Sequence, residues 1–234
     1  QASILVSLES ILHASEQLMV ISSLDEFWRT AVEIARDRLG FERCGIFPYE
    51  PEPHAFHGTY AVDMRGQLYD AQKTVWPVEQ FPILGEAMQR DADQSRWYIN
   101  RNAPIYNSVD GTPIALDIRA WMVGTPIRTQ AGEPMGVMLN DSAITNRPLD
   151  PVQQDLLSVY VSMVGNIAHR KMLEMRLQEA NAALENRVQE RTKALAESEE
   201  RFRSLVQHSQ DIFAIIDDSG MLSYVNPALC RLTG

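Results

Sequence analysis

The chain has 234 residues, a hydrophobic fraction of 45% and a formal net charge of -10 at pH 7. The hydrophobic content supports a packed core, but no window approaches the roughly 18 apolar residues of a membrane span, so we expect no membrane contact from this sequence. The negative charge argues against nucleic acid as a partner, because binding to phosphates needs a concentrated basic surface.

The two cysteines, Cys44 and Cys230, lie far apart in segments that read as a strand and a helix. Neither belongs to the paired spacing of a disulfide framework or a zinc cluster, so we expect a reducing compartment. The chain begins with Gln1 instead of Met and stops at Gly234 within a pattern, so we interpret it as a fragment of a longer protein.

Two helices are predicted in the first 40 residues. The first is amphipathic, and its wide apolar stripe recurs at helical spacing at Ile4, Leu5, Leu8, Ile11, Leu12, Leu18 and Met19. The second begins after Ser23, a favourable N-cap with Glu26 as its reciprocal partner, and ends at Gly40.

Strand-like segments follow the helices. Runs at 43–50 and 56–62 predict a hairpin, and runs on either side of Gly132 predict a second and stronger one. We expect the middle, from Asp63 to Asp117, to be irregular, with a short helix at 82–90 and a strand at 96–100.

A very long helix is predicted to start after Asp150, with Pro151 at its first position and Gln153 completing a capping box. No helix-breaking residue follows until about Ser209, so the helix would extend roughly 85 Å, beyond any one compact domain. A stripe at the start of this helix is expected to cover the sheet of the same domain, and it consists of Leu157, Val161, Val164 and Ala168.

The order of these elements predicts an α+β fold with an antiparallel sheet flanked by helices. Residues 18–170 resemble a GAF domain. The residues that carry the resemblance are the runs SLDEFWRTAVEIARDRLGFERCGIFPYE and AWMVGTPIRTQAGEPMGVMLNDS and the helix that follows them. The resemblance is one of pattern and order over the whole segment.

A seven-residue repeat continues along the long helix. One core position is taken by Tyr160, Ile167, Asn181, Val188, Leu195 and Phe202, and the other by Leu156, Met163, Leu177, Leu184 and Leu205. We expect residues 171–207 to form a parallel coiled coil in a homodimer, and residues 1–17 to join the dimer bundle. Before Arg170, an alternative is that both stripes pack within one subunit.

Polar residues also occupy core positions of the repeat, namely Arg170, Glu174, Asn181, Arg191 and Ser198. Such residues weaken a coiled coil but restrict its register. They fit a helix that transmits a signal by small shifts, and equally a seam that is simply solvated.

The end of the chain, residues 208–234, resembles the beginning of a PAS domain through DDSG, YVNPA and LTG. Two strands are expected here, at 212–216 and 222–225, and they are too small to bury a core of their own. The helix before them, with NRVQERTKAL, resembles the signalling helices of bacterial histidine kinases and diguanylate cyclases.

These resemblances imply a cytoplasmic signal-transduction protein whose output domain, a histidine kinase in the first instance or a diguanylate cyclase, lies outside the sequence. We expect no catalytic site in the chain: His169 is followed by Arg170 and Lys171, unlike a phosphoacceptor. His54 and His57 lack a defined tetrahedral set, so we predict a surface loop there and no metal.

The GAF resemblance also implies a ligand pocket between the sheet and the middle of the domain. Aromatic walls with a few polar groups are typical of small-molecule sites, although aromatic residues also fill ordinary cores. The candidate residues are Trp76, Phe81, Trp97, Tyr98, Tyr106, Asp117, Arg119 and Trp121, with Arg96, Arg101 and Asn107 as further polar candidates.

The ligand itself stays unknown. A covalent bilin is not expected, because phytochrome-type GAF domains use a Cys followed by His in the middle region and no cysteine occurs between Cys44 and Cys230. The elements of cyclic-nucleotide GAF domains are also absent as a recognisable set. A domain without any ligand, serving as a dimerisation scaffold, is the alternative.

Overall fold

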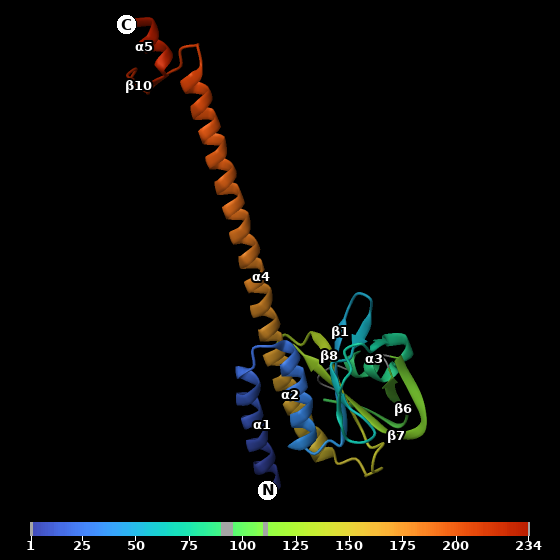
Figure 1. Cartoon of the computed structure of the whole chain (residues 1–234). Helices are drawn as coiled ribbons and strands as arrows, with labels where there is room; N and C mark the ends of the chain where they lie inside the picture. The colour runs from blue at the N-terminus through green and yellow to red at the C-terminus, as the bar shows by residue number, and fades with distance from the viewer. Residues whose placement is uncertain (1, 90–95, 110–111, 234) are drawn as a thin grey trace. The chain divides into compact units, whose positions relative to one another are not determined.

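The computed structural model describes residues 2–89, 96–109 and 112–233 (Figure 1). It divides into two compact units, Gln1–Glu174 and Met175–Gly234. The helices are α1 (Ala2–Val20), α2 (Leu24–Asp37), the short 3-10 turn η1 (Val78–Gln80), α3 (Pro82–Gln89), α4 (Pro151–His208) and α5 (Pro227–Thr233). None of the helices in these ranges is both long enough and apolar enough to cross a lipid bilayer.

Within the described residues, the strands of unit 1 form one antiparallel sheet with the main order β4-β3-β1-β8-β7-β6, and β2 joins β1 to β5. The predicted hairpin around Gly132 is confirmed, and this glycine has a φ of 86° in the turn between β7 and β8. The strands are β1 (Arg43–Glu50), β2 (Ala55–His57), β3 (Tyr60–Val62), β4 (Leu68–Asp70), β5 (Val75–Pro77), β6 (Tyr98–Val109), β7 (Thr112–Arg128) and β8 (Pro134–Asp141).

The strand predicted at 96–100 is present from Tyr98, but the prediction that the rest of the second half of the middle is irregular was wrong. Residues 98–109 and 112–128 form β6 and β7, the longest strands of the sheet, and they pair along most of their length. β6 shows little strand alternation because Asn100, Asn102 and Pro104 interrupt it, and the pairing accommodates them with two register shifts. The short helix predicted at 82–90 is confirmed as α3 over Pro82–Gln89, and Arg90 lies outside the described residues.

Helices cover both faces of the sheet (Figure 1). α1, α2 and the first turns of α4 enclose the main core with one face, and α3 packs on the other. The stripe predicted to cover the sheet, Leu157 to Ala168, is fully buried against Ile127 and Met138. Gly165 permits this close approach, because a Cβ there would lie 2.6 Å from the backbone oxygen of Arg128 on β7.

The predicted N-caps Ser23 and Asp150 are confirmed, but neither predicted capping box is completed in the described residues. The Ser23 hydroxyl accepts a bond from the backbone N–H of Glu26 at 3.4 Å, and Asp150 Oδ1 accepts one from the N–H of Val152 at 2.9 Å. Gln153 does not complete a capping box: its side-chain amide donates to the carbonyl of Leu39 at 2.6 Å. The start of α4 is thereby tied to the end of α2.

Tyr160 corrects the predicted dimer seam. Its side chain is 0% exposed, and its hydroxyl donates to the carbonyl of Ala31 on α2 at 2.8 Å. Leu156, Met163 and Ile167 are partly buried against the same core. The alternative of packing within one subunit therefore holds at Tyr160, and the first part of α4 keeps only some of its predicted seam available to a partner.

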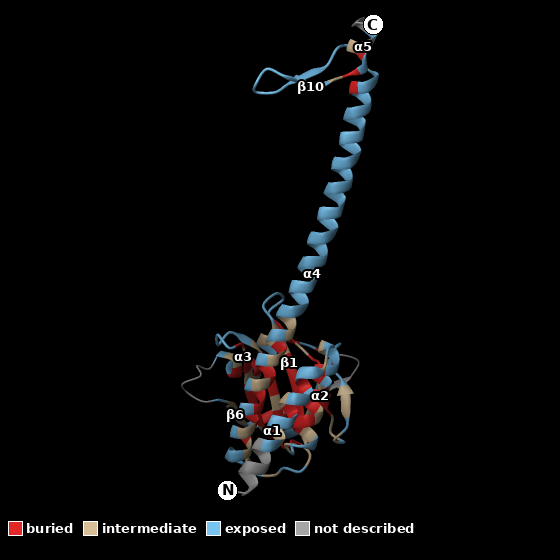
Figure 2. Cartoon of the chain, turned by 90° about the vertical axis from the view of Figure 1, so that its left-hand side faces the viewer, coloured by how far each residue is buried: buried red, intermediate tan, exposed pale blue. Residues whose placement is uncertain are grey.

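Unit 2 buries very little. Its part of α4 is exposed at every residue from 175 to 205 (Figure 2). The strands β9 (Ala214–Ile216) and β10 (Leu222–Val225) form a hairpin whose turn is bonded to Asp217 Oδ1, and the pKa of this carboxyl is lowered by the Ser219 hydroxyl. The apolar side chains of the hairpin are mostly exposed, as expected for so small a segment.

Candidate ligand site

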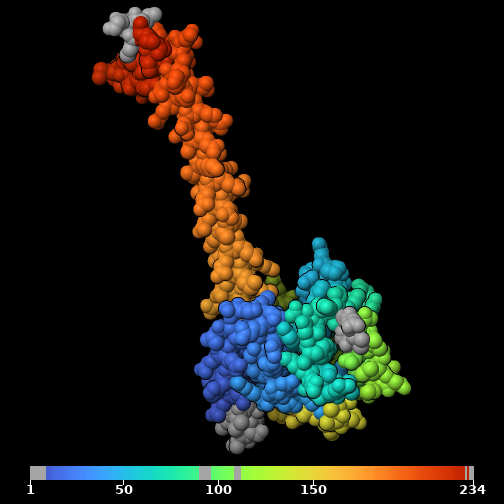
Figure 3. Space-filling view, viewed as in Figure 1, coloured from blue at the N-terminus to red at the C-terminus, as the bar shows by residue number. Residues whose placement is uncertain are grey.

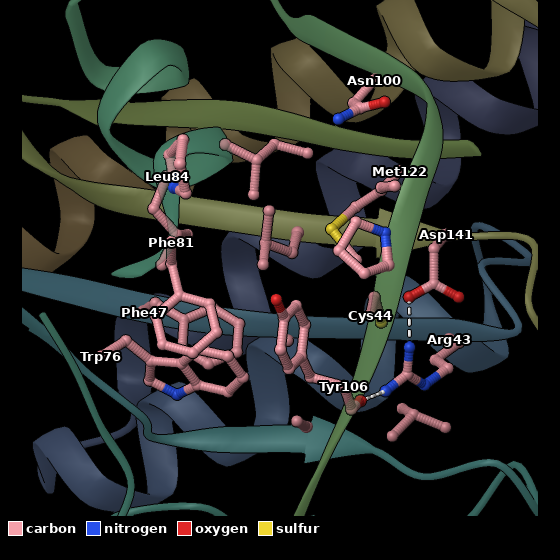
Figure 4. Close-up of a pocket in the computed structure, with 18 of the residues that line it drawn as sticks. Arg43, Cys44, Phe47, Trp76, Phe81, Leu84, Asn100, Tyr106, Met122 and Asp141 are labelled. Atoms are coloured by element: carbon pink, nitrogen blue, oxygen red, sulfur yellow. Dashed lines mark hydrogen bonds and ion pairs between the residues drawn. The ribbon is translucent and has the colours of Figure 1, made fainter. Parts of the chain in front are cut away.

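A cavity of about 240 Å³ lies in unit 1, between α3 and the sheet face that α3 covers. Its walls come from β1, from β3 to β8, and from the segment that leads from η1 into α3 (Figure 4). The buried residues beside it, such as Phe56, Leu84 and Val137, hold these elements together as a second core.

Aromatic rings form one side of the cavity. The Trp76 and Phe81 ring centroids are 3.9 Å apart, and those of Phe81 and Tyr106 are 4.9 Å apart, in edge-to-face arrangements. Phe47 packs edge-on against Trp76 at 5.7 Å. Figure 4 shows these rings together on one side, with the Tyr106 ring turned toward the middle of the cavity. Such a wall favours a planar, largely apolar molecule.

A buried ion pair forms the other side (Figure 4). Arg43 and Asp141 are directly opposed on the paired strands β1 and β8, and their side chains are 10% and 6% exposed. Arg43 Nη1 donates to Asp141 Oδ2, and Nη2 donates to the carbonyl of Tyr106. Burial raises the pKa of Asp141, while Arg43 and the N–H of Ala143 oppose this rise.

This ion pair sets the charge of the cavity. Arg43 and Asp141 are the charged side chains among its described lining residues, and they compensate each other. The polar groups of the lining that remain for a ligand include the hydroxyls of Tyr69 and Tyr106 and the amides of Gln80 and Asn100, although Asn100 Oδ1 already accepts a bond from the N–H of Asn102. Two buried donors of lining residues, Trp76 Nε1 and Arg43 Nε, have no hydrogen-bond partner within the described part of the chain. The cavity therefore favours an uncharged ligand that carries hydrogen-bonding groups.

Cys44 also lines the cavity, but its thiol is not set up for covalent chemistry. Burial raises the pKa of Cys44 to about 12. Because the thiolate is the reactive form, only about one thiol in 10⁵ would be ionised at pH 7. A ligand in this cavity would be held without a covalent bond to Cys44.

The structure brings three of the predicted aromatic residues together: Trp76, Phe81 and Tyr106 all line the cavity. Tyr98 is partly buried against the same aromatic cluster without lining the cavity. Trp97 lies elsewhere, and its indole N–H donates to Asp155 on α4 at 3.0 Å.

The remaining predicted residues also lie outside the cavity. The indole N–H of Trp121 donates to the carbonyl of Arg147 at 2.7 Å, and Arg119 donates to the carbonyl of Asn102 at 2.9 Å. Asp117 is exposed on β7. The polar candidates Arg96, Arg101 and Asn107 do not line the cavity either.

Sequence reasoning missed the ion pair and Asn100. Arg43 begins β1 and Asp141 ends β8, so they are 98 residues apart and meet only through strand pairing. A charged residue at the edge of an otherwise apolar strand, as Arg43 is before CGIF, was the available signal.

The histidines of the β1–β2 hairpin contact neighbours in the same hairpin. The Tyr49 hydroxyl lies 2.6 Å from His54 Nδ1, and His57 Nε2 lies 3.2 Å from Glu50 Oε2. Across the described ranges, no three His, Cys, Asp or Glu side chains gather as a metal site would require.

Comparison with protein-family models identifies the last part of the chain. Residues 200–234 match the model of the PAS domain family. No curated protein matches the sequence.

Solved structures resemble the fold at low sequence identity. The photosensory core of the Stigmatella aurantiaca phytochrome superposes with a TM-score of 0.55 at 16% identity, covering 100% of this chain and 52% of its own. This chain thus spans about half of that module. A fragment of a methyl-accepting chemotaxis protein gives 0.54 at 20% identity, with 68% of this chain and 97% of its own covered.

A third similar structure is itself a GAF domain. The phycoerythrobilin-bound GAF domain of a cyanobacterial phytochrome has a TM-score of 0.53 at 14% identity, and the match covers 72% of this chain and 97% of that domain. Unit 1 therefore has the fold of a GAF domain, and the long helix α4 connects it to a segment that matches the PAS family.

Proposed function

We propose that this chain is the sensory part of a cytoplasmic bacterial signal-transduction protein. The GAF-fold unit binds a small molecule, and a homodimer paired along α4 relays the bound state to the PAS segment and an output domain. The output domain is proposed to be the histidine kinase of a two-component system, with a diguanylate cyclase as the alternative. The downstream sequence of the parent protein decides between them: a phosphoacceptor histidine with an ATP-binding domain, or a GGDEF motif.

The cavity beside Tyr106 is the observation that carries the ligand proposal. Its volume of about 240 Å³ lies below the roughly 300–1,000 Å³ of common ligand pockets, so the ligand is small. The aromatic wall and the internally compensated ion pair favour an uncharged planar compound. The ligand is therefore proposed to differ from the phycoerythrobilin of the cyanobacterial domain, and Cys44 is proposed not to form a covalent link.

Features on two helices support the homodimer. On α4, the apolar residues from Leu177 to Leu205 recur at seven-residue spacing and are exposed. On α1, Leu12 and Met19 are also exposed and seven residues apart, which supports a place for this helix in the dimer bundle. Size-exclusion chromatography with light scattering tests this part: we expect a dimer that weakens when Val188 and Leu195 are changed to Asp.

Thermal unfolding in the presence of small compounds tests the ligand proposal. Indole serves as the neutral planar probe and benzoate as an anionic probe of similar size. At a concentration 100-fold above its Kd, a ligand adds about 2.7 kcal/mol, which corresponds to a rise in Tm of about 5–10 °C for a domain of this size. We expect neutral planar compounds to raise Tm and their anionic counterparts to have little effect.

Two variants tie the effect to the cavity. Ala103→Leu places extra side-chain volume at a buried lining position, and Tyr106→Phe removes one hydroxyl with little change of shape. The first should abolish the shift, and the second should weaken binding of a hydrogen-bonding compound about 3–10-fold. Trp121→Phe, outside the cavity, is the matched control and should bind normally. A dimer that no compound stabilises, or a shift that ignores both cavity variants, would favour the ligand-free scaffold.

A further inference from the structure

The exposed apolar face of α4 is built from two columns of residues, and one of them changes position along the helix. One column is shared by the whole face and has a residue every seven positions: Leu156, Met163, Arg170, Leu177, Leu184, Arg191, Ser198 and Leu205. A coiled-coil seam needs a second column beside it, either three or four residues after each shared position.

In the first part of α4, the exposure of the side chains indicates which second column is available to a partner. Tyr160, four residues after Leu156, is 0% exposed because it packs against α2, whereas Val159, three residues after Leu156, is 39% exposed. Leu173, three residues after Arg170, is 48% exposed. In unit 1, the column available to a partner therefore runs through Val159, Asn166 and Leu173.

Side-chain chemistry selects the other column in the second part, where every residue of α4 up to Leu205 is exposed. Four residues after each shared position stand Asn181, Val188, Leu195 and Phe202. Three residues after each shared position stand Ala180, Arg187, Ala194 and Arg201, which offer no large apolar side chain. The usable column in unit 2 continues the column of unit 1 that holds Tyr160, which is buried, Ile167, which is partly buried, and the exposed Glu174.

The change of column is a change of spacing. The face proceeds through Arg170, Leu173, Leu177, Asn181 and Leu184 in steps of three, four, four and three residues. In a regular heptad repeat, steps of three and four residues alternate. Two consecutive steps of four, from Leu173 to Leu177 and from Leu177 to Asn181, are therefore equivalent to an insertion of four residues. Such an insertion locally unwinds a left-handed coiled coil, because eleven residues then complete three turns.

We infer that a second copy of this chain pairs in parallel along this face, with an unwound joint at residues 170–184 where the register changes. This inference rests on the homodimer of the proposed function and specifies its geometry. It replaces the predicted continuous repeat, in which Tyr160 and Ile167 would continue the column of Val188.

Charge supports a parallel second copy as the occupant. In unit 2, one flank of the seam carries Glu185 and Glu199, and the opposite flank carries Arg187 and Arg201. In a parallel pair, each acidic flank faces the basic flank of the other helix. In an antiparallel pair, like flanks would meet and repel.

Cysteine cross-linking tests the joint. The background is the full chain with Cys230→Ser, in which Cys44 stays unreactive because burial raises its pKa to about 12. Single cysteines at Val159, Leu173 and Val188 should form intermolecular disulfides at least 5-fold faster than cysteines at the matched controls Ile167, Glu174 and Arg187. Circular dichroism of each reduced variant checks that the fold is retained.

Two results would overturn the inference in distinguishable ways. Fast cross-linking at Ile167 and Glu174 with slow cross-linking at Val159 and Leu173 would establish a continuous repeat and leave the dimer intact. A monomer by light scattering, with no cross-links at any position, would remove the second copy and the relay together, while the ligand test stands separately.

A deletion provides an independent measurement. Removing residues 174–177 joins Leu173 to a seam of regular three and four spacing, whereas removing residues 174–180 leaves the double step of four. We expect the four-residue deletion to tighten the dimer at least 10-fold and the seven-residue deletion to leave it unchanged or weaker. Equal affinities for the two deletions would contradict an unwound joint.

Discussion

Replacing Asp141 with Leu probes the ion pair that closes one side of the cavity. The substitution removes the carboxylate that accepts from Arg43 and leaves the guanidinium in a site where its side chain is only 10% exposed. The second contact of Arg43, with the Tyr106 carbonyl, remains but carries no compensating charge. The variant therefore isolates the cost of one unpaired buried charge.

The expected loss is large for a single substitution. Removing one partner of a buried ion pair typically costs about 3–5 kcal/mol, because the other charge stays desolvated. With a urea m-value of about 2 kcal/mol/M, the unfolding midpoint of unit 1 should fall by about 1.5–2.5 M.

Tryptophan fluorescence is the appropriate assay. All four tryptophans of the chain lie in residues 28–121, so the signal follows the unfolding of unit 1. Protein concentration is held constant, because dimerisation would otherwise shift the midpoint.

The double variant Arg43→Met with Asp141→Leu is the control. Apolar residues of similar volume often replace a buried ion pair at little cost, so the double variant should lie within about 1.5 kcal/mol of the original. A loss below about 1 kcal/mol for Asp141→Leu, or a double variant as unstable as the single one, would refute the view that the pair is buried and coupled.

Arg43→Met leaves Asp141 without its partner, so the stability lost in this variant should depend on pH. Burial already raises the pKa of Asp141, and losing Arg43 removes the main influence that lowers it. A carboxyl with a raised folded pKa stabilises the folded state below its unfolded pKa, and this contribution is lost as pH rises through the folded pKa. The destabilisation by Arg43→Met should thus be smaller at pH 5 than at pH 8. A constant difference in stability between the two chains across this range would argue against a carboxylate left unpaired.

Two further predictions concern buried groups. Tyr160→Phe should cost about 1 kcal/mol in urea unfolding, since it removes the hydrogen bond to Ala31, and the loss should not depend on protein concentration, as it would if Tyr160 lay in a dimer interface. In a chain with Cys230→Ser, Cys44 should react with Ellman's reagent at pH 8 at least about 50-fold slower than a free thiol, because the thiol is buried and its pKa is raised to about 12. Rapid labelling of the folded chain would mean that the thiol is accessible as a thiolate.

Elements governed by neighbouring residues were predictable from the sequence. The start of α4 depends on Asp150 and Pro151, and the β7–β8 turn depends on Gly132 with its positive φ. The PAS segment was recognisable from the turn and helix start around Asp217 and Asn226, whose contacts are within 20 residues of one another. Local chemistry was sufficient in each case.

The candidate site was predictable only in part. The cavity is lined by three of the predicted aromatic residues, Trp76, Phe81 and Tyr106. Trp97 and Trp121 were predicted on the same ground, as aromatic residues near the middle of the domain, but they lie outside the cavity and their indole N–H groups are hydrogen-bonded elsewhere. Aromatic content predicts burial, and it does not predict which of two sheet faces or loop sides an aromatic ring covers.

β6 and the ion pair could not be predicted from the sequence, because both depend on how the strands pair in the sheet. Asn100 and Pro104 contradict a strand pattern, yet the backbone of β6 pairs with β7 because the long edge of that strand is available. Arg43 and Asp141 become neighbours only when β1 and β8 align.

The sequence by itself determined the α+β order, the length of α4 and the seven-residue recurrence along it, because caps, turns and periodicity act over a few residues. The tertiary structure decided which side of that recurrence is free. Tyr160 and Val159 are adjacent and both suit an interface, but α2 covers the first and leaves the second exposed. Periodicity defines the stripes of a helix, whereas only the packed neighbours determine which stripe remains for a partner.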